Sequence, residues 1–302
     1  MSFAKDLAWA EVVHGISKRG PSNRARLREK LKAVQFDQVF APHRSWTSRF
    51  LSRSLKPRQS IGFDFFGSSL FFNLAVPDLP NWPEALRILS LLQIFDPKWS
   101  FSNLRDMNLN QPSLWHQHRH SFACTLPRRE RRDFSHGSCR VAIFPGSQWE
   151  GKKWPAGHFL RLGRKLHSEG FQVVFFGGGQ EVDFQDQLQR EWPEAESWIG
   201  KISLVQTFQK LREFDLVLSN DSAGQHLGAL AGCGVVSLFG PTVLGLGFRP
   251  WTELWRPMEL SLPCRPCNPH GPRACPLGTH ACLRNLSVEQ VLFEIRSFSK
   301  EL

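Results

Sequence analysis

The densest group of side chains that could do chemistry lies between residues 219 and 232, which read SNDSAGQHLGALAG. These fourteen positions hold an acid, two hydroxyls, two amides, a histidine and three glycines, and apolar runs precede and follow them. Asp221 or Ser222 stands where the N-cap of a helix belongs. The free N–H groups and the dipole of such a helix end favour an anion such as a diphosphate. An ordinary capped helix would use the same residues, so the neighbouring loops decide between the two interpretations.

Three further loops carry polar or glycine-rich sequences directly after apolar runs. PGSQWEGKKWP follows residues 140–144, GGGQE follows 172–176 and GPT follows 235–239. Ligands of open α/β sheets bind beyond the carboxyl ends of the strands, so four such loops on one rim predict a binding site. Lys152 can neutralise a phosphate as a point charge, although a solvated lysine would look the same. Neither the dinucleotide-binding G-x-G-x-x-G spacing nor a G-x-x-x-x-G-K-[ST] loop occurs, which disfavours an NAD-linked dehydrogenase or a P-loop NTPase.

A cysteine-rich segment near the C-terminus is the second candidate for chemistry. It reads CRPCNPHGPRACPLGTHAC. Its C-x-x-C pair and two later cysteines could enclose zinc or an iron–sulfur cluster, but the later spacings form no second close pair. Free thiols in a proline-braced loop are the interpretation that the spacing favours. The candidate zinc ligands are Cys264, Cys267, Cys275 and Cys282, with His270 and His280 nearby.

The apolar runs that must position these loops alternate with helical patterns. The runs expected to form buried parallel strands are residues 140–144, 172–176, 215–218 and 235–239. Residues 156–170 place Phe159, Leu162 and Leu166 on one helical stripe, which stops at Gly170. Strands that alternate with helices predict a doubly wound α/β sheet.

The first half of the chain is less regular. It holds a basic amphipathic helix over residues 23–35, a strand over 36–42 and another helix over 82–95. Residues 111–140 are polar and without sustained periodicity, which is typical of a connection between domains. We predict two domains, residues 1–125 and 126–302, and the first contains only one clear strand–helix repeat.

The composition is that of a globular protein, with 302 residues, 41% hydrophobic and 22% charged. The net charge of +11 indicates an anionic partner, namely nucleic acid, a membrane surface or a phosphorylated substrate. A solvated basic face is the plainer alternative. No apolar run is long enough to cross a bilayer, and Asp6 and Glu11 interrupt the stretch where a signal peptide would lie. These features predict a cytoplasmic protein with reduced cysteines.

Taken in order, these motifs resemble glycosyltransferase family 9, whose members include the ADP-heptose:lipopolysaccharide heptosyltransferases. The resemblance rests on FPGSQWEGKKWP, SNDSAGQHLGALAG, VVSLFGPT, GFRPW and the PCRPC…CP…HAC segment, with FDQVFAPHRSWTSRFL and IGFDF upstream. It implies the GT-B architecture, in which two Rossmann-like domains face each other across a cleft. It also implies that the C-terminal domain holds the nucleotide sugar ADP-heptose and the N-terminal domain holds the acceptor.

The resemblance further implies roles for individual residues. Lys152 would contact the diphosphate or the sugar, Asp221 the heptose hydroxyls, and Glu181 the ribose or the sugar. The other residues implied at the donor site are Ser147, Ser222, Ala223, Gly224, His226 and Thr242. The implied reaction is inverting transfer, in which a carboxylate takes the acceptor proton while lysine and helix end stabilise the departing ADP. No metal or other cofactor is required for it.

One residue that the family pattern requires is missing. The family's base is an aspartate in a Gly-Asp pair after the first strand, and no such pair occurs near the start of this sequence. Asp6 lies in the different setting AKDLAW. We therefore expect that the first strands of an incomplete N-terminal domain are absent, through a late start codon, a truncated gene or a degenerate paralogue. The catalytic residue of this chain is therefore unknown. We expect the chain to bind ADP-sugar weakly and to transfer sugar poorly, and measurable heptose transfer would contradict this expectation.

The basic surface would suit a phosphorylated lipopolysaccharide acceptor and peripheral contact with the inner face of the inner membrane. The turn APHRSWTSR offers His43, Arg44 and Arg49 as acceptor contacts, although surface basic residues would look the same. Two other classes stay open. One is a non-catalytic nucleotide-sugar-binding remnant. The other is a nucleic-acid-binding protein with a zinc-bound cysteine cluster, which ranks last because no nucleic-acid-binding module is recognisable.

Overall fold

A computed structural model of the chain describes residues 21–78, 84–95, 139–250, 252–268 and 270–302. The chain divides into two compact units, Met1–Gln111 and Pro112–Leu302, which are described separately below. The predicted boundary between residues 125 and 126 lies outside the described residues and stays a prediction. No helix in the described ranges combines the length and the apolar character that crossing a membrane requires.

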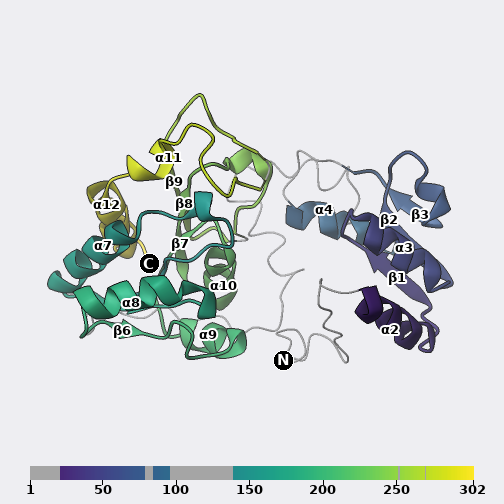
Figure 1. Ribbon diagram of the computed structural model, residues 1–302, viewed down its shortest axis with the longest axis horizontal. Coiled ribbons are helices and arrows are strands. Elements are labelled where there is room, and N and C mark those ends of the chain that lie inside the picture. Colours follow the sequence, from purple (N-terminus) through teal and green to yellow (C-terminus); the bar gives the residue numbers. More distant parts are fainter. Residues whose placement is uncertain (1–20, 79–83, 96–138, 251, 269) are drawn as a thin grey trace. The chain divides into compact units, whose positions relative to one another are not determined.

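The second unit is built on a six-stranded parallel sheet (Figure 1). The strands are β4 (Arg140–Phe144), β5 (Gln172–Phe175), β6 (Glu196–Ser197), β7 (Leu216–Asn220), β8 (Gly234–Phe239) and β9 (Trp255–Glu259). Their order is β6-β5-β4-β7-β8-β9, so the chain moves outward from β4 in one direction and from β7 in the other. The predicted doubly wound α/β sheet is therefore confirmed, and the four predicted strands correspond to β4, β5, β7 and β8.

Helices pack on both faces of this sheet. They are α7 (Ala156–Ser168), α8 (Val182–Glu191), α9 (Leu204–Leu211), α10 (Ala223–Ala231), α11 (Ala281–Arg284) and α12 (Val288–Ser299), with the short turns η5 (Glu150–Lys152), η6 (Gly179–Glu181) and η7 (Leu244–Leu246). Helices α7, α8 and α12 share one core with alternate residues of the central strands. Phe159, Leu162 and Leu166 are fully buried in it, as the helical stripe predicted. The left-handed φ of +89° at Gly170 follows the end of α7.

Helix α10 packs on the opposite face, and its glycines let it approach the sheet closely. Val217 alternates with Leu216 and Leu218, which belong to the first core, so its side chain points to the other face. A Cβ atom at Gly228 would lie 2.7 Å from Val217 Cγ2, and one at Gly224 would lie 2.6 Å from Phe144 Cγ. Any side chain at these positions would push α10 away from the sheet.

The first unit carries a smaller parallel sheet in the order β1-β2-β3. Its elements are α2 (Pro21–Lys32), β1 (Gln38–Ala41), α3 (Trp46–Ser54), β2 (Gln59–Phe63), η1 (Ser68–Leu70), β3 (Leu74–Val76), α4 (Glu84–Ser90) and η2 (Leu91–Ile94). The predicted helix over residues 82–95 is thus α4 followed by the tighter turn η2. The buried core is small and centres on Ile61, Phe63, Val76 and Leu91. That this domain is incomplete stays a prediction.

The close approach of α10 can be tested with two glycine substitutions. Gly228→Ala should lower the free energy of unfolding by about 1–3 kcal/mol, because the new methyl group overlaps the Cβ and Cγ2 atoms of a β-branched strand residue. Gly157→Ala in α7 is the matched control, since a Cβ atom there would come no closer to another side chain than 4.0 Å, to Arg161 Nη1, and the change should be neutral or stabilising. Urea unfolding measures both. Equal effects of the two substitutions would contradict the close contact.

Candidate functional site

The predicted loops converge at the carboxyl edge of the six-stranded sheet. Strands β4 and β7 are neighbours whose chains continue in opposite directions, and this switch point is where open α/β sheets bind ligands. A cavity of about 390 Å³ lies there. The predicted residues that line it are Ser147, Glu181, Asp221, Ser222, Ala223 and Gly224. An apolar wall of the same cavity includes Phe144, Phe176, Leu204 and Leu227.

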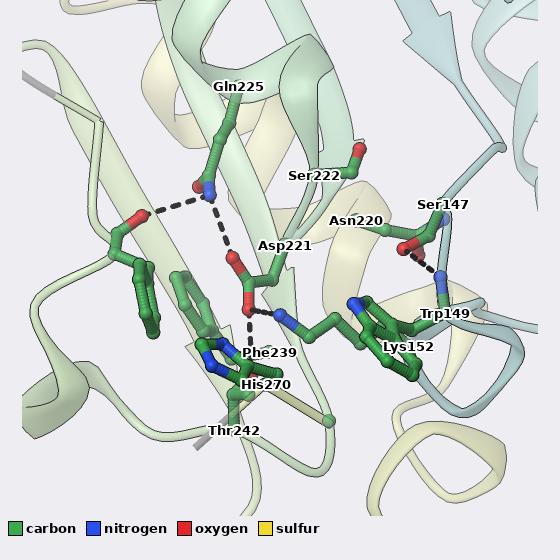
Figure 2. Close-up of polar contacts among 12 residues, drawn as sticks. Ser147, Trp149, Lys152, Asn220, Asp221, Ser222, Gln225, Phe239, Thr242 and His270 are labelled. Atoms are coloured by element: carbon green, nitrogen blue, oxygen red, sulfur yellow. Dashed lines mark hydrogen bonds and ion pairs between the residues drawn. The ribbon is translucent and has the colours of Figure 1, made fainter. Parts of the chain in front are cut away.

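The carboxylate of Asp221 gathers polar groups from four segments (Figure 2). Lys152 Nζ, which follows β4, donates to Asp221 Oδ2 at 2.7 Å. Thr242 Oγ1, which follows β8, donates to the same oxygen at 2.7 Å. Gln225 Nε2 on α10 donates to Asp221 Oδ1 at 3.0 Å. Asp221 itself comes directly after β7, so one carboxylate links the ends of three strands and a helix.

This group is almost entirely buried. Asp221 is 5% exposed and Lys152 is 7% exposed, while Thr242 and Gln225 are fully buried. A buried carboxylate is tolerated because charged and neutral donors satisfy it. Within the described part of the chain, Asp221 is the sole hydrogen-bond acceptor of Lys152 Nζ, which leaves two N–H groups of the ammonium without a described acceptor.

Three predicted donor-site residues do not line the cavity. Lys152 and Thr242 lie behind Asp221 and contact its carboxylate, so direct phosphate contacts from them stay predictions. His226 lies on α10, and its side chain is exposed. Although His226 has exposed surface, the protein that packs around its imidazole has the largest influence and lowers its pKa, while the charge of Asp221 raises the pKa and the charge of Lys152 lowers it. The net lowering favours a neutral imidazole beside the site.

The start of α10 has the geometry expected for an anion. Ser222 is the N-cap residue, as predicted, but its hydroxyl makes no capping bond. Its Oγ lies 3.2 Å from Ser219 Oγ instead. The first N–H groups of α10 therefore have no side-chain cap from Ser222. They belong to Ala223 and Gly224, which line the cavity, so they suit an anion bound there.

Two amide side chains complete the site, and sequence reasoning gave them no role. Gln225 supports Asp221 as described above, and its Nε2 also donates to Phe248 O at 3.2 Å. Asn220 Nδ2 donates to Pro145 O at 2.8 Å, and Asn220 Oδ1 accepts from Trp154 N at 2.9 Å. Asn220 therefore fixes the loop after β4 against the end of β7. Both amides lie within the polar segment 219–232, whose composition was the available signal.

Glu181 lies at the cavity between two loops. Its Oε2 accepts from Gly178 N at 2.7 Å, so it closes the turn that begins η6. A Cβ atom at Gly146 would lie 2.2 Å from Glu181 Oε1, which shows how closely this carboxylate packs against the loop after β4. Glu181 thus reaches the cavity from β5, and its predicted contact with a ribose or sugar stays a prediction.

The cysteine-rich segment, residues 264–282, gives the zinc prediction no support. Within the described ranges no three His, Cys, Asp or Glu side chains form a group that could hold a metal ion. Among the four candidate cysteines, Cys264 is exposed, Cys282 is buried at the start of α11, and the other two are half-buried. All four are free thiols.

The segment also braces the loop that carries Thr242. Arg265, a residue without a role in the sequence analysis, has a side chain that is 4% exposed. Its guanidinium donates to Thr242 O and to Glu259 Oε2, each at 2.6 Å, and also to the carbonyls of Gly240 and Leu260. Cys267 N adds a bond of 2.9 Å to Pro241 O. The loop after β8 is thereby held at several consecutive carbonyls.

The same segment braces the loop that carries Lys152. Gly151 N donates to Pro272 O at 3.2 Å, and His280 Nε2 lies 2.7 Å from Gly151 O. A Cβ atom at Gly271 would lie 2.8 Å from Lys152 Cε, so the lysine stem packs directly on this glycine. Residues 264–282 therefore position two of the three side chains that bind the Asp221 carboxylate.

The predicted acceptor contacts belong to the first unit: His43 and Arg44 lie on the turn between β1 and α3, and Arg49 lies on α3. His43 Nδ1 accepts from Ser45 N at 3.2 Å, and Arg44 Nη1 forms an ion pair of 3.0 Å with Asp78. The Arg49 guanidinium lies 3.5 Å from the ring centre of Phe65. The role of these three residues toward an acceptor stays a prediction. Asp6, the aspartate nearest the start, lies outside the described residues.

Comparison with known proteins bears directly on this site. The family model of glycosyltransferase family 9 (heptosyltransferase) matches residues 24–275. The chain belongs to glycosyltransferase family 9. The match spans the first unit, the four polar loops and most of the cysteine-rich segment, so the family assignment rests on both units.

Curated relatives agree with this family 9 membership. Lipooligosaccharide heptosyltransferase 2 of Campylobacter jejuni is 26% identical over 166 residues, covering 53% of this chain and 51% of the relative. Lipopolysaccharide heptosyltransferase 2 of Salmonella typhimurium is 25% identical over 243 residues, covering 76% of this chain and 66% of the relative. The chain therefore spans about half to two thirds of the length of these family 9 relatives.

Solved structures of family 9 proteins share the fold. The Escherichia coli ADP-heptose LPS heptosyltransferase II has a TM-score of 0.68 at 18% identity, over 93% of this chain and 81% of that one. An E. coli heptosyltransferase solved with ADP has a TM-score of 0.64 at 19% identity, over 98% and 87%. The α/β GT-B fold class predicted for the chain is confirmed by this likeness.

The bracing role of Arg265 leads to a matched pair of substitutions. Arg265→Lys should lower the free energy of unfolding by about 2–3 kcal/mol, because a lysine keeps the charge but cannot reach the spread of carbonyls that the guanidinium satisfies. Arg273→Lys is the control, since Arg273 is exposed in the same segment. Urea unfolding at neutral pH compares them. If both variants kept wild-type stability, the brace would be dispensable.

Proposed function

We propose that this chain binds a nucleotide sugar, ADP-heptose, at the carboxyl edge of the six-stranded sheet. The observation that carries the proposal is the cavity at the β4–β7 switch point, bordered by the first residues of α10 and by the Asp221 carboxylate. A diphosphate needs N–H donors and positive charge, and a sugar needs a carboxylate acceptor. The helix-end residues and the Asp221 carboxylate line one cavity, and the Lys152 ammonium contacts that carboxylate.

Each group would meet a different part of the ligand. The N–H groups at Ala223 and Gly224 and the free N–H groups of Lys152 suit the diphosphate. Asp221 uses three hydrogen bonds among the described residues, and a carboxylate offers about four lone-pair positions, which leaves capacity for a sugar hydroxyl. The apolar wall that includes Phe144 and Phe176 suits the faces of a nucleobase.

We further propose that the protein takes part in heptose transfer during lipopolysaccharide core synthesis, with inversion at the transferred carbon. Family 9 membership and the heptosyltransferase relatives support this, and one related structure holds ADP. The acceptor would be a phosphorylated core or lipid A, met at the cytoplasmic face of the inner membrane. The base that takes the acceptor proton is not identified. A chain that binds ADP without transferring sugar would be the nucleotide-sugar-binding remnant considered above.

Calorimetric titration with ADP tests the donor site. Lys152→Met should weaken ADP binding about 10–100-fold, because it removes a charge-assisted contact while the alkyl stem still packs on Gly271. Lys153→Met is the matched control, since Lys153 pairs with the exposed Glu150 at 2.6 Å and should leave binding unchanged. UDP and GDP, titrated in parallel, report base selectivity. Circular dichroism establishes that both variants are folded.

The titration has a clear opposing outcome. Wild-type protein that is folded but binds no ADP, or equal loss in both lysine variants, would remove the support for a donor site at this cavity.

A further inference from the structure

The first unit carries a surface of exposed aromatic and basic side chains that the donor site does not use. We call it the aromatic–arginine face and define it as Trp46, Arg49, Phe50, Arg53, Phe66 and Leu70. Trp46, Phe50 and Leu70 are 60%, 59% and 61% exposed, and Phe66 is fully exposed. Single exposed apolar residues are ordinary, but four large ones on adjacent elements call for a partner.

The face is an ordered surface and not a set of isolated side chains. The Trp46 and Phe50 rings pack on Phe71, with centres 5.8 and 5.3 Å away. The Arg49 guanidinium covers Phe65 at 3.5 Å and Trp46 at 4.9 Å. The Arg53 side chain donates to Leu70 O, which ties α3 to the connection between β2 and β3 (Figure 1). The exposed rings therefore stand on a fixed base.

The charge of this region points to an anionic partner. Residues 42–73 contain five Lys/Arg and one acid, Asp64, whose Oδ1 accepts from Ser68 Oγ at 2.5 Å. The basic residues are Arg44, Arg49, Arg53, Lys56 and Arg58. Arg44 is paired with Asp78, and the others have no ion pair among the described residues. The stretch of chain that carries the exposed apolar side chains is therefore strongly basic.

We propose that the aromatic–arginine face docks on an anionic lipid bilayer. Tryptophan, phenylalanine and leucine enter the boundary between headgroups and acyl chains, and arginines beside them bind lipid phosphates. Nucleic acid fits less well, because the exposed side chains of Leu70 and Phe66 add apolar area that a phosphate backbone does not cover. The proposal rests on the proposed function only in that a lipid-borne acceptor would give this docking a purpose.

Vesicle sedimentation with the full chain tests the proposal. The protein should bind phosphatidylcholine vesicles that contain phosphatidylglycerol about ten-fold more tightly than pure phosphatidylcholine vesicles, and salt should weaken the binding. The double variant Trp46→Ser/Phe66→Ser should lose at least about ten-fold in partitioning. Phe293→Ser, at a 69% exposed position on α12 in the other unit, is the matched control and should bind as wild type.

A charge pair completes the design. Lys56→Gln/Arg58→Gln should lower partitioning about twenty-fold, and Arg284→Gln/Lys300→Gln, at exposed positions in the second unit, should not.

Equal binding to both kinds of vesicle, or no binding, would overturn the proposal. So would a dimer in sedimentation velocity that Trp46→Ser/Phe66→Ser abolishes, since a second copy would then occupy the face. So, too, would nucleic-acid binding that the same variant abolishes.

The two proposals can fail separately. ADP titration of the Trp46→Ser/Phe66→Ser variant should match wild type, because its substitutions lie in the first unit. Vesicle binding without ADP binding would keep the docking face and remove the donor site. ADP binding without vesicle binding would do the reverse.

Discussion

The buried carboxylate of Asp221 is the constraint around which the second unit is arranged. A charge removed from water is tolerated only when donors surround it, and here the donors come from separate strand ends and from α10. Lys152 supplies the opposite charge, and Thr242 and Gln225 supply neutral donors. The loops after β4, β7 and β8 must therefore hold a common geometry, which is also the geometry that shapes the cavity. The stability of the second unit and the shape of the cavity therefore depend on the same few contacts.

The cysteine-rich segment forms a second layer behind this carboxylate. It reaches the loop after β8 through Arg265 and the loop after β4 through Pro272 and His280. These contacts join residues separated by more than a hundred positions, such as Gly151 and His280. A segment with the residue types of a metal site thus serves as structural support, made by a guanidinium, prolines and backbone bonds.

Local patterns in the sequence sufficed for strands β4, β5, β7 and β8, the helical stripe of α7 and the convergence of the polar loops, because burial follows from short-range periodicity. The same patterns could not show that Lys152 and Thr242 both donate to the Asp221 carboxylate, because residue types and spacing do not specify which side chains from separate loops meet. The role of Arg265 could not be predicted for another reason. The sequence around an arginine between two cysteines suggests only a surface charge, and the carbonyls of Gly240 and Leu260, which Arg265 binds, come close to it only in the folded chain. The predicted boundary between residues 125 and 126 lies outside the described residues, and the expected absence of the first strands stays a prediction.

The backbone approach between Gly151 and Gly271 has an evolutionary consequence. Gly271 has a φ of +83° and faces the lysine stem, and a Cβ at Gly151 would lie 2.4 Å from Pro272 O. A side chain at Gly151 would separate the two loops, and one at Gly271 would strain the backbone and displace the Lys152 stem. Residues 273–279 are mostly exposed, and a Cβ atom at Gly278 would meet no other atom within 4 Å, although its φ of +69° also favours glycine. Sequence drift and changes of length should therefore accumulate in that outer stretch, while the two glycines and the residues that they contact persist as a linked set.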